Sequence, residues 1–138
     1  MAKLKVQVWI FHRDEQQAVG CLLLKTTPAR GGFWQPVTGG VEAGESLEAA
    51  AMREVAEETG WSIDSPICDL DRCFNYQKNG TEFEEHGFAL WVDQRKDPRL
   101  DPGEHCDWAW VQADQAPHLL GFQSNRDMLQ AGLNQKKQ

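Results

Sequence analysis

Residues 46–60 limit the possible folds of this chain more than any other stretch. Ser46 can cap a helix by accepting a backbone hydrogen bond, and Gly60 can end one in a left-handed conformation. The sequence therefore predicts a helix over residues 47–59. The segments on either side favour strands, and a helix among strands buries its apolar face by packing against a sheet.

Five segments have the composition and the alternation that are typical of strands. They are residues 4–11, 18–25, 65–77, 81–94 and 106–112. The turn at Lys78-Asn79-Gly80 predicts a hairpin between the third and the fourth of them. Residues 26–40 contain two prolines and four glycines, which predicts a long ordered loop of a kind that is often functional.

The C-terminal part completes the expected fold. Residues 124–133 predict a final helix with Ser124 as its N-cap, and residues 113–120 predict a helical turn, whereas residues 134–138 are expected to fray. With 138 residues and no visible linker or repeat, the chain is expected to form one domain over residues 1–138. The order of elements predicts the α/β (α+β) class, with a mixed sheet and helices packed against it.

Composition and charge argue against several classes of function. The formal net charge is −7, and nucleic-acid-binding surfaces are normally basic. No signal peptide and no apolar run of membrane-spanning length is visible, so a cytoplasmic location is expected. None of the four cysteines forms a CxxC pair, so zinc-binding spacing is absent, and those in or next to strands are expected to be buried.

Glu54, Glu57 and Glu58 crowd into five residues of the predicted helix. Their i, i+3, i+4 spacing spreads the carboxylates over an arc of about 100° on one helix face. Repulsion between such neighbours costs roughly a few tenths of a kcal/mol when they are solvated, and the helix dipole disfavours negative charge near the C-terminus. A divalent cation would remove both penalties, and Mg²⁺ or Mn²⁺ suits these oxygen ligands. The alternative is an acidic face that is only solvated.

The spacing around these glutamates resembles the Nudix box. Its defining positions are filled by Gly39, Glu45, Arg53-Glu54-Val55, Glu57-Glu58 and Gly60-Trp61, separated in turn by five, seven, one and one residues. Only Trp61 is unusual, because an aliphatic residue is common there. The resemblance implies a Nudix fold, which is a mixed sheet between helices, and hydrolysis of a nucleoside diphosphate linked to another group with Mg²⁺ or Mn²⁺.

The resemblance also implies roles for single residues. The residues that match metal ligands are Glu54, Glu57 and Glu58, one of which can act as the base. By the same similarity, Arg53 orients a glutamate, Glu45 pairs with Arg53, and the carbonyl of Gly39 often completes the coordination. For Arg53 the alternative is a surface pair with a glutamate one helical turn away.

Upstream of the box, FWQPVTGG followed by AAMREVAEE resembles the dihydroneopterin triphosphate pyrophosphatase group of the family, as do EHCDWAWV and SNRDML further on. The similarity implies a further metal ligand at Glu104 and substrate contacts from Thr38 and Lys5. An arginine that the group carries after its second strand has no clear match, and Lys25 or Arg30 could replace it.

These positions also have simpler interpretations. Thr38 can shape a turn, Lys5 can be solvated, and Glu104 can be an ordinary loop residue. Trp34 can stack on a base or a pterin ring, or it can pack in the core. The lone histidines, His86 and His105, are expected to be structural or exposed.

Together these features predict metal-dependent hydrolysis of a nucleoside or pterin triphosphate to the monophosphate and pyrophosphate. A related hypothesis is a hydrolase of a dinucleoside polyphosphate, ADP-ribose or capped RNA, although the acidic composition argues against RNA. A third hypothesis is a nucleotide-binding sensor without turnover, which would need fewer carboxylates. The expected partner is a small triphosphate rather than a membrane or a nucleic acid, and both a monomer and a homodimer stay open.

Overall fold

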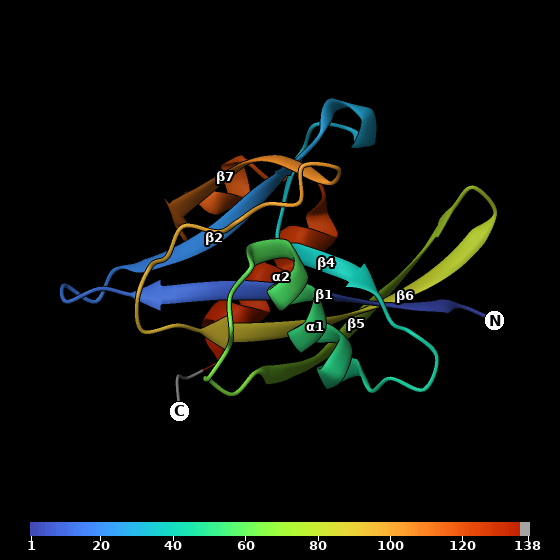
Figure 1. The fold of residues 1–138 in the computed structure, drawn as a ribbon, viewed down its shortest axis with the longest axis horizontal. Coiled ribbons are helices and arrows are strands. Elements are labelled where there is room, and N and C mark those ends of the chain that lie inside the picture. The colour runs from blue at the N-terminus through green and yellow to red at the C-terminus, as the bar shows by residue number, and fades with distance from the viewer. Residues whose placement is uncertain (136–138) are drawn as a thin grey trace.

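One long strand, β1 (Lys3–Arg13), organises the sheet in the computed structural model, which describes residues 1–135 (Figure 1). β1 pairs in parallel with β6 (Thr81–Trp91) along most of its length. On its other side, β1 pairs antiparallel with β4 (Val37–Gly40) near its start and with β2 (Val19–Thr26) near its end. This arrangement brings the glycines that precede the glutamate helix to the middle of the sheet.

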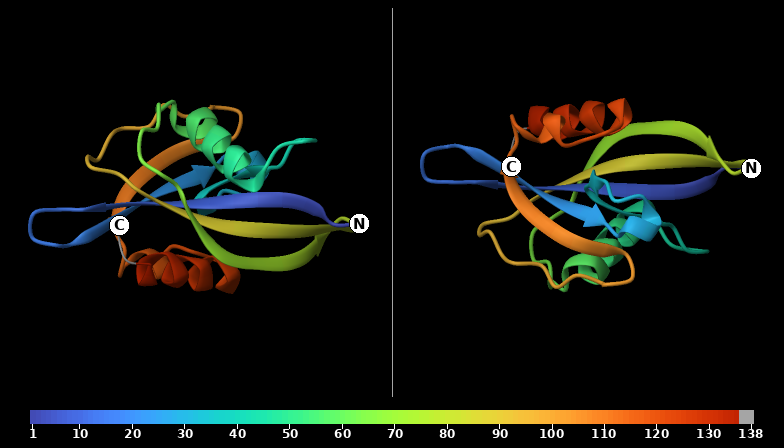
Figure 2. Two further views of the ribbon diagram at one scale, coloured as in Figure 1. Left: turned by 90° about the horizontal axis from the view of Figure 1, so that it is seen from below. Right: turned by 90° about the horizontal axis from the view of Figure 1, so that it is seen from above.

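The remaining elements complete a seven-stranded mixed sheet with α1 and α2 on opposite faces (Figure 2). β5 pairs with β6, and β3 and β7 both pair with β2. The bounds are Trp34–Gln35 for β3, Cys68–Lys78 for β5, His105–Gln112 for β7, Leu47–Thr59 for α1 and Gln123–Asn134 for α2, with 3₁₀ turns at Pro28–Arg30 and Ala116–His118. The expected α/β class, a mixed sheet between helices, is confirmed.

Alternation along β1 supplies two separate cores. The even-numbered Val6 and Val8 pack in one cluster with Val55 of α1. The odd-numbered Trp9 packs in the other cluster with Leu129 of α2. Successive strand residues point to opposite faces, and cross-strand partners share a face. Each strand residue can therefore be assigned to the α1 face or the α2 face of the sheet.

Helix α1 begins and ends where the sequence predicts. The Ser46 hydroxyl accepts a hydrogen bond from the Ala49 backbone N–H at 3.0 Å. Gly60 has a φ of 75°, which is the left-handed conformation that glycine adopts at helix ends. The helical turn expected within residues 113–120 is also present, as the 3₁₀ turn Ala116–His118. No helix within residues 1–135 is long and apolar enough to span a bilayer.

The prediction that residues 26–40 form only a loop is wrong. They contain a 3₁₀ turn and the short strands β3 and β4, which pair with β2 and β1. The N-cap expected at Ser124 is wrong too, because α2 begins at Gln123 and its N-cap position is Phe122. Of the terminal segment expected to fray, Asn134 closes α2 and residues 136–138 lie outside the described part.

The expectation of buried cysteines holds for one of the four. Cys21 is buried in the core of the α2 face, whereas Cys68 is half-buried and Cys73 and Cys106 are exposed. Cys68 and Cys73 lie on β5, which is an edge strand with a partner on one side only. No disulfide links any of these thiols, so all four are free.

Candidate metal and catalytic site

The guanidinium of Arg53 connects the glutamates of α1 to the loop that precedes the helix. Its Nε and Nη2 donate to the two oxygens of Glu45 at 2.8 and 3.0 Å, and Nη2 also donates to the Gly40 carbonyl at 2.8 Å. Its Nη1 donates to Glu54 at 2.9 Å and to Glu57 at 3.1 Å. The paired contact with Arg53 is the main cause that lowers the pKa of Glu45 to about 2. Arg53 thus has many more partners than a simple surface pair would give it.

Two glutamates of α1 turn inward, since Glu54 is 7% and Glu58 only 1% exposed. Oε1 of Glu58 is buried and has no hydrogen-bond partner among the described residues. Burial, followed by the charges of Glu54 and Glu104, raises the pKa of Glu58 to about 9, although a hydrogen bond from the Thr38 backbone opposes the shift. Burial also raises the pKa of Glu54, against the effect of Arg53. Such a buried, partly unpaired carboxylate calls for a proton or a cation.

Gly39 of β4 leaves room for one of these carboxylates. A Cβ at this position would lie 1.9 Å from the carboxyl carbon of Glu54, so a side chain fits only if Glu54 moves. At the neighbouring Gly40, a Cβ would meet nothing within 4 Å. The first glycine of the box is therefore explained by a close approach between β4 and α1. The role of its carbonyl as a metal ligand stays a prediction.

Glu104 reaches the same region from the loop before β7. Its charge is among the causes that raise the pKa of Glu54 and Glu58, and its Oε1 lies 3.7 Å from Nη2 of Arg30. The structure thus brings Glu104 and Arg30 together beside the glutamates of α1. Their expected roles, as a metal ligand and a phosphate contact, stay predictions.

His105, which follows Glu104, is a buried neighbour of this region. It is 2% exposed, its Nε2 lies 2.9 Å from the Gln35 side-chain nitrogen, and its Nδ1 is buried without a hydrogen-bond partner in residues 1–135. Burial and the charge of Arg30 lower its pKa, which favours the neutral ring. Its position directly after an acidic residue was the only signal in the sequence.

The other four predicted substrate contacts lie on the α2 face. Thr38 pairs with Gln7 of β1, and Lys5 occupies another odd-numbered position of that strand. Lys25 pairs with Trp34, and its ammonium lies 5.8 Å from the ring centroid of Trp34, which packs against the core of the α2 face. The interpretation that Trp34 packs against the core is therefore confirmed, although its side chain is only partly buried. The backbone of the sheet lies between these side chains and the α1 glutamates.

A buried polar network on the α2 face was missed by the sequence analysis. Gln7 accepts a hydrogen bond from Trp9 Nε1 at 2.6 Å and donates one to Oε2 of Glu85, also at 2.6 Å. Tyr76 donates to Oε1 of Glu85 at 3.0 Å, and burial together with Glu85 raises the pKa of this tyrosine, so it stays a donor. Glu85 is 5% exposed and is the cross-strand partner of Lys5. Only the polar Gln7 within an otherwise apolar stretch of β1 hinted at this network.

The residues on the α1 side fit a hard divalent cation. They offer carboxylate oxygens, of which one is buried and unpaired, and Arg53 neutralises only part of their charge. Hard oxygen donors of this kind favour Mg²⁺ or Mn²⁺ over softer metals. Together with a cation, the cluster could bind a phosphate chain and activate a water molecule.

Comparison with known proteins identifies the family of this chain. The NUDIX domain model matches residues 3–132. An octanoyltransferase of Myxococcus xanthus is 42% identical over 110 residues, which cover 77% of this chain and 30% of that protein. A dihydroneopterin triphosphate diphosphatase of Haemophilus influenzae is 31% identical over 110 residues, covering 70% of this chain and 68% of that protein. An RNA pyrophosphohydrolase of Erythrobacter litoralis is 32% identical over 108 residues, covering 64% of this chain and 65% of that protein.

These matches mean that the chain spans less than a third of the octanoyltransferase and about two thirds of the other two relatives. Among solved structures, the dihydroneopterin triphosphate pyrophosphohydrolase of E. coli has a TM-score of 0.80 and 28% identity, with 98% of this chain and 99% of that chain covered. Nudix hydrolases generally use divalent metal ions, which agrees with the donor set on α1. Because the family match extends over almost the whole sequence, the chain belongs to the Nudix family, whose hydrolases act on phosphoanhydride bonds.

Proposed function

We propose that this chain, as one catalytic domain, hydrolyses a nucleoside or pterin triphosphate to the monophosphate and pyrophosphate. The observation that carries the proposal is the buried carboxylate of Glu58, with its unpaired oxygen, beside Glu54 and the charge of Glu104. In the proposal, Mg²⁺ or Mn²⁺ is held by Glu54, Glu57, Glu58 and Glu104, together with the carbonyl of Gly39. A protein that only binds nucleotides would have no need for so many converging carboxylates.

The chain's own groups then have separate tasks. When bound, the cation neutralises phosphate oxygens and lowers the pKa of a coordinated water. Arg53 is a positioning residue, because its Nη1 holds Glu54 and Glu57 while Glu45 and the Gly40 carbonyl hold the guanidinium. A carboxylate of the cluster accepts the proton of the attacking water. Arg30 can meet the negative phosphate chain from the side of Glu104.

The α2 face supports a particular class of base. Each ionised carboxylate oxygen can accept more than one hydrogen bond, so Glu85 keeps acceptor capacity beyond Gln7 and Tyr76. Guanine and pterin rings both present a ring N–H beside an exocyclic amino group, and these two donors match a carboxylate. Adenine, cytosine and uracil do not present this pair. The relative named dihydroneopterin triphosphate diphosphatase supports the same choice.

A cavity lies beside the start of β1 and the end of β4. It has a volume of about 520 Å³ and is lined by residues that include Lys5, Gly40 and Phe83. Gly40 accepts a hydrogen bond from Arg53 on the metal side, whereas Lys5 is the partner of Glu85 on the α2 face. In the proposal, the base lies on the α2 side of β4 and the metal on the α1 side.

The test is a product assay with Mg²⁺ and four substrates: dihydroneopterin triphosphate, dGTP, dATP and dCTP. We expect pyrophosphate and a monophosphate, with the first two substrates preferred. Orthophosphate as the sole inorganic product would refute the proposed reaction. Glu85→Gln should reduce the preference for dGTP over dATP by about tenfold or more. Glu82→Gln, at an exposed position on the opposite face of β6, is the matched control.

The second candidate is removal of pyrophosphate from RNA 5′ ends, which the relative named RNA pyrophosphohydrolase favours. The net charge of −7 weighs against it, because RNA binding normally needs a basic surface. A 5′-triphosphorylated RNA oligonucleotide belongs in the same assay. Faster turnover of this oligonucleotide than of every small triphosphate would replace the first proposal by the second.

A further inference from the structure

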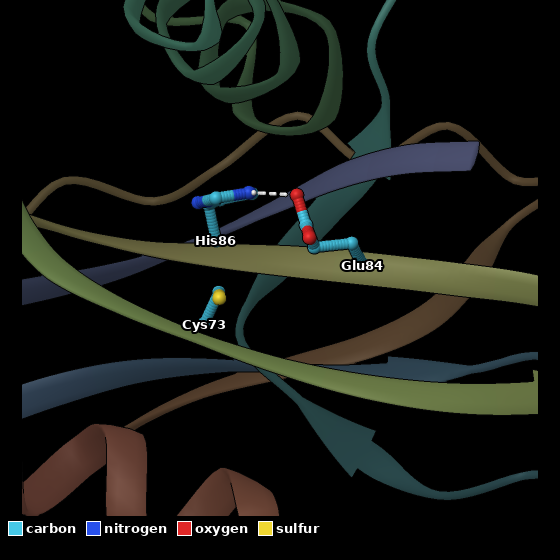
Figure 3. A group of neighbouring side chains, drawn as sticks. All are labelled: Cys73, Glu84 and His86. Atoms are coloured by element: carbon cyan, nitrogen blue, oxygen red, sulfur yellow. Dashed lines mark hydrogen bonds and ion pairs between the residues drawn. The ribbon is translucent and has the colours of Figure 1, made fainter. Parts of the chain in front are cut away.

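Three potential metal ligands that play no part in the proposed reaction converge on the α1 face of β5 and β6. They are Cys73, Glu84 and His86, and their ligand atoms all lie within 4.8 Å of one another (Figure 3). His86 Nε2 lies 2.9 Å from Oε2 of Glu84. No disulfide occupies the thiol of Cys73. None of the three residues is among those assigned to the proposed metal site at the glutamate cluster.

Strand geometry explains why these side chains meet. Glu84 and His86 are two residues apart on β6, so they point to the same face. Cys73 is the direct antiparallel partner of His86 on β5, where Cβ atoms of partners are about 4.5–5.5 Å apart. Two ligands from one strand and a third from its neighbour form a triangle above the sheet.

An irregularity in β5 decides which residue faces His86. The register shifts between Asp69, which pairs with Phe88, and Cys73, which pairs with His86. Without this shift, Asp71 would stand opposite His86. Instead Asp71 adopts a φ of 55°, and its N–H is held by the Asp69 carboxylate at 2.8 Å. Bulges often re-aim a side chain in this way, and here the bulge supplies a thiol in place of a carboxylate.

We propose that Cys73, Glu84 and His86 bind a zinc-class divalent cation. Sulfur, nitrogen and oxygen together are the usual ligands of Zn²⁺, whereas Mg²⁺ and Mn²⁺ prefer oxygen alone. Three protein ligands with a water in the fourth position are common for Zn²⁺. The side chains of Glu84 and His86 are 35% and 22% exposed and Cys73 is exposed, so an ion can enter from solvent. The sequence shows no zinc spacing because the ligands come from two strands.

Cobalt titration of the metal-stripped full chain tests this site directly. A thiolate bound to Co²⁺ gives a charge-transfer absorption that carboxylate ligands alone cannot give. We expect this absorption to saturate as Co²⁺ is added and to disappear on addition of Zn²⁺. It should be absent in Cys73→Ser, and His86→Ala should weaken Co²⁺ binding by about tenfold or more. The readout does not depend on hydrolysis, so it stands even if the proposed reaction is wrong.

Two controls make the result decisive. Cys106→Ser removes another exposed cysteine, on β7, and should keep the absorption. The double variant Glu54→Gln/Glu58→Gln disables the glutamate cluster and should also keep it. Circular dichroism verifies that each variant is folded. No thiolate absorption in the unmodified chain, or its persistence in Cys73→Ser, would overturn the proposal and leave Glu84 and His86 as a hydrogen-bonded pair.

Discussion

Replacing Glu58 by glutamine isolates the consequence of burying this carboxylate. The pKa of Glu58 rises from 4.5 to about 9 in the metal-free protein, so the folded chain keeps a proton there that the unfolded chain loses near pH 4.5. Because the pKa of Glu58 is higher in the folded chain, this group contributes its full stabilisation at pH values below its pKa in the unfolded chain. The contribution is lost as the pH rises through about 9. Between these limits, the free energy of unfolding falls by about 1.4 kcal/mol per pH unit on account of this group.

Urea unfolding in the presence of a chelator measures the effect. From about pH 6 to about pH 8, Glu58 should lower the free energy of unfolding of the unmodified chain by about 3 kcal/mol, a change that Glu58→Gln lacks. Saturating Mg²⁺ should reduce the slope of the unmodified chain, because metal ligands are deprotonated. Glu48→Gln, on an exposed residue of the same helix, is the matched control.

Activity gives a second readout from the same variant. Turnover of Glu58→Gln with Mg²⁺ should fall about 100-fold or more, since even the loss of a residue that only supports a metal ligand costs about 10–100-fold. Parallel pH dependences for Glu58→Gln and the unmodified chain would refute the inference that a buried, protonated carboxylate exists in the metal-free cluster. Unchanged turnover would separately refute its role in catalysis.

Three further substitutions test the surroundings of the cluster. Gly39→Ala should lower kcat/KM by about 100-fold, because its Cβ displaces the Glu54 carboxylate, whereas Gly40→Ala should not; equal effects would contradict the close-approach explanation. Arg53→Lys keeps the charge but loses the planar guanidinium with its several donors, so kcat should fall by about tenfold or more with KM little changed. A rise in KM alone would count against a positioning role. Ser46→Ala should lower the free energy of unfolding, measured in urea, by about 1 kcal/mol; no change would mean that the cap is unimportant.

The bounds of α1 and the shared face of its glutamates could be predicted from interactions between residues that are close in the sequence. The cap at Ser46, the end at Gly60 and the shared face of the carboxylates depend on contacts within one or two helical turns. The contact between Arg53 and Glu45 also lies within the box, at a separation of eight residues. These features need no knowledge of the sheet, and the family resemblance rested on the same residues.

Short strands and buried polar groups were not predictable in this way. β3 and β4 are two and four residues long, and they exist because β2 and β1 supply hydrogen-bonding partners. The contact between Gln7 and Glu85 joins residues 78 positions apart. Cys73 faces His86 only because of an irregular register in β5. Each of these features depends on which strands become neighbours, and no local pattern carries that information.

Glu57 and Glu58 show most clearly what the sequence determines and what depends on the tertiary structure. The sequence by itself determined that both lie on one helix, on the face of Glu54, with a spacing that suits a metal. Only the tertiary structure decided that the Glu57 side chain is 54% exposed while its neighbour Glu58 is 1% exposed. The physical reason is that burial depends on β4 and β1, which pack against α1 and lie outside the helix. The same nonlocal packing sets the raised pKa of Glu58 and leaves its oxygen unpaired.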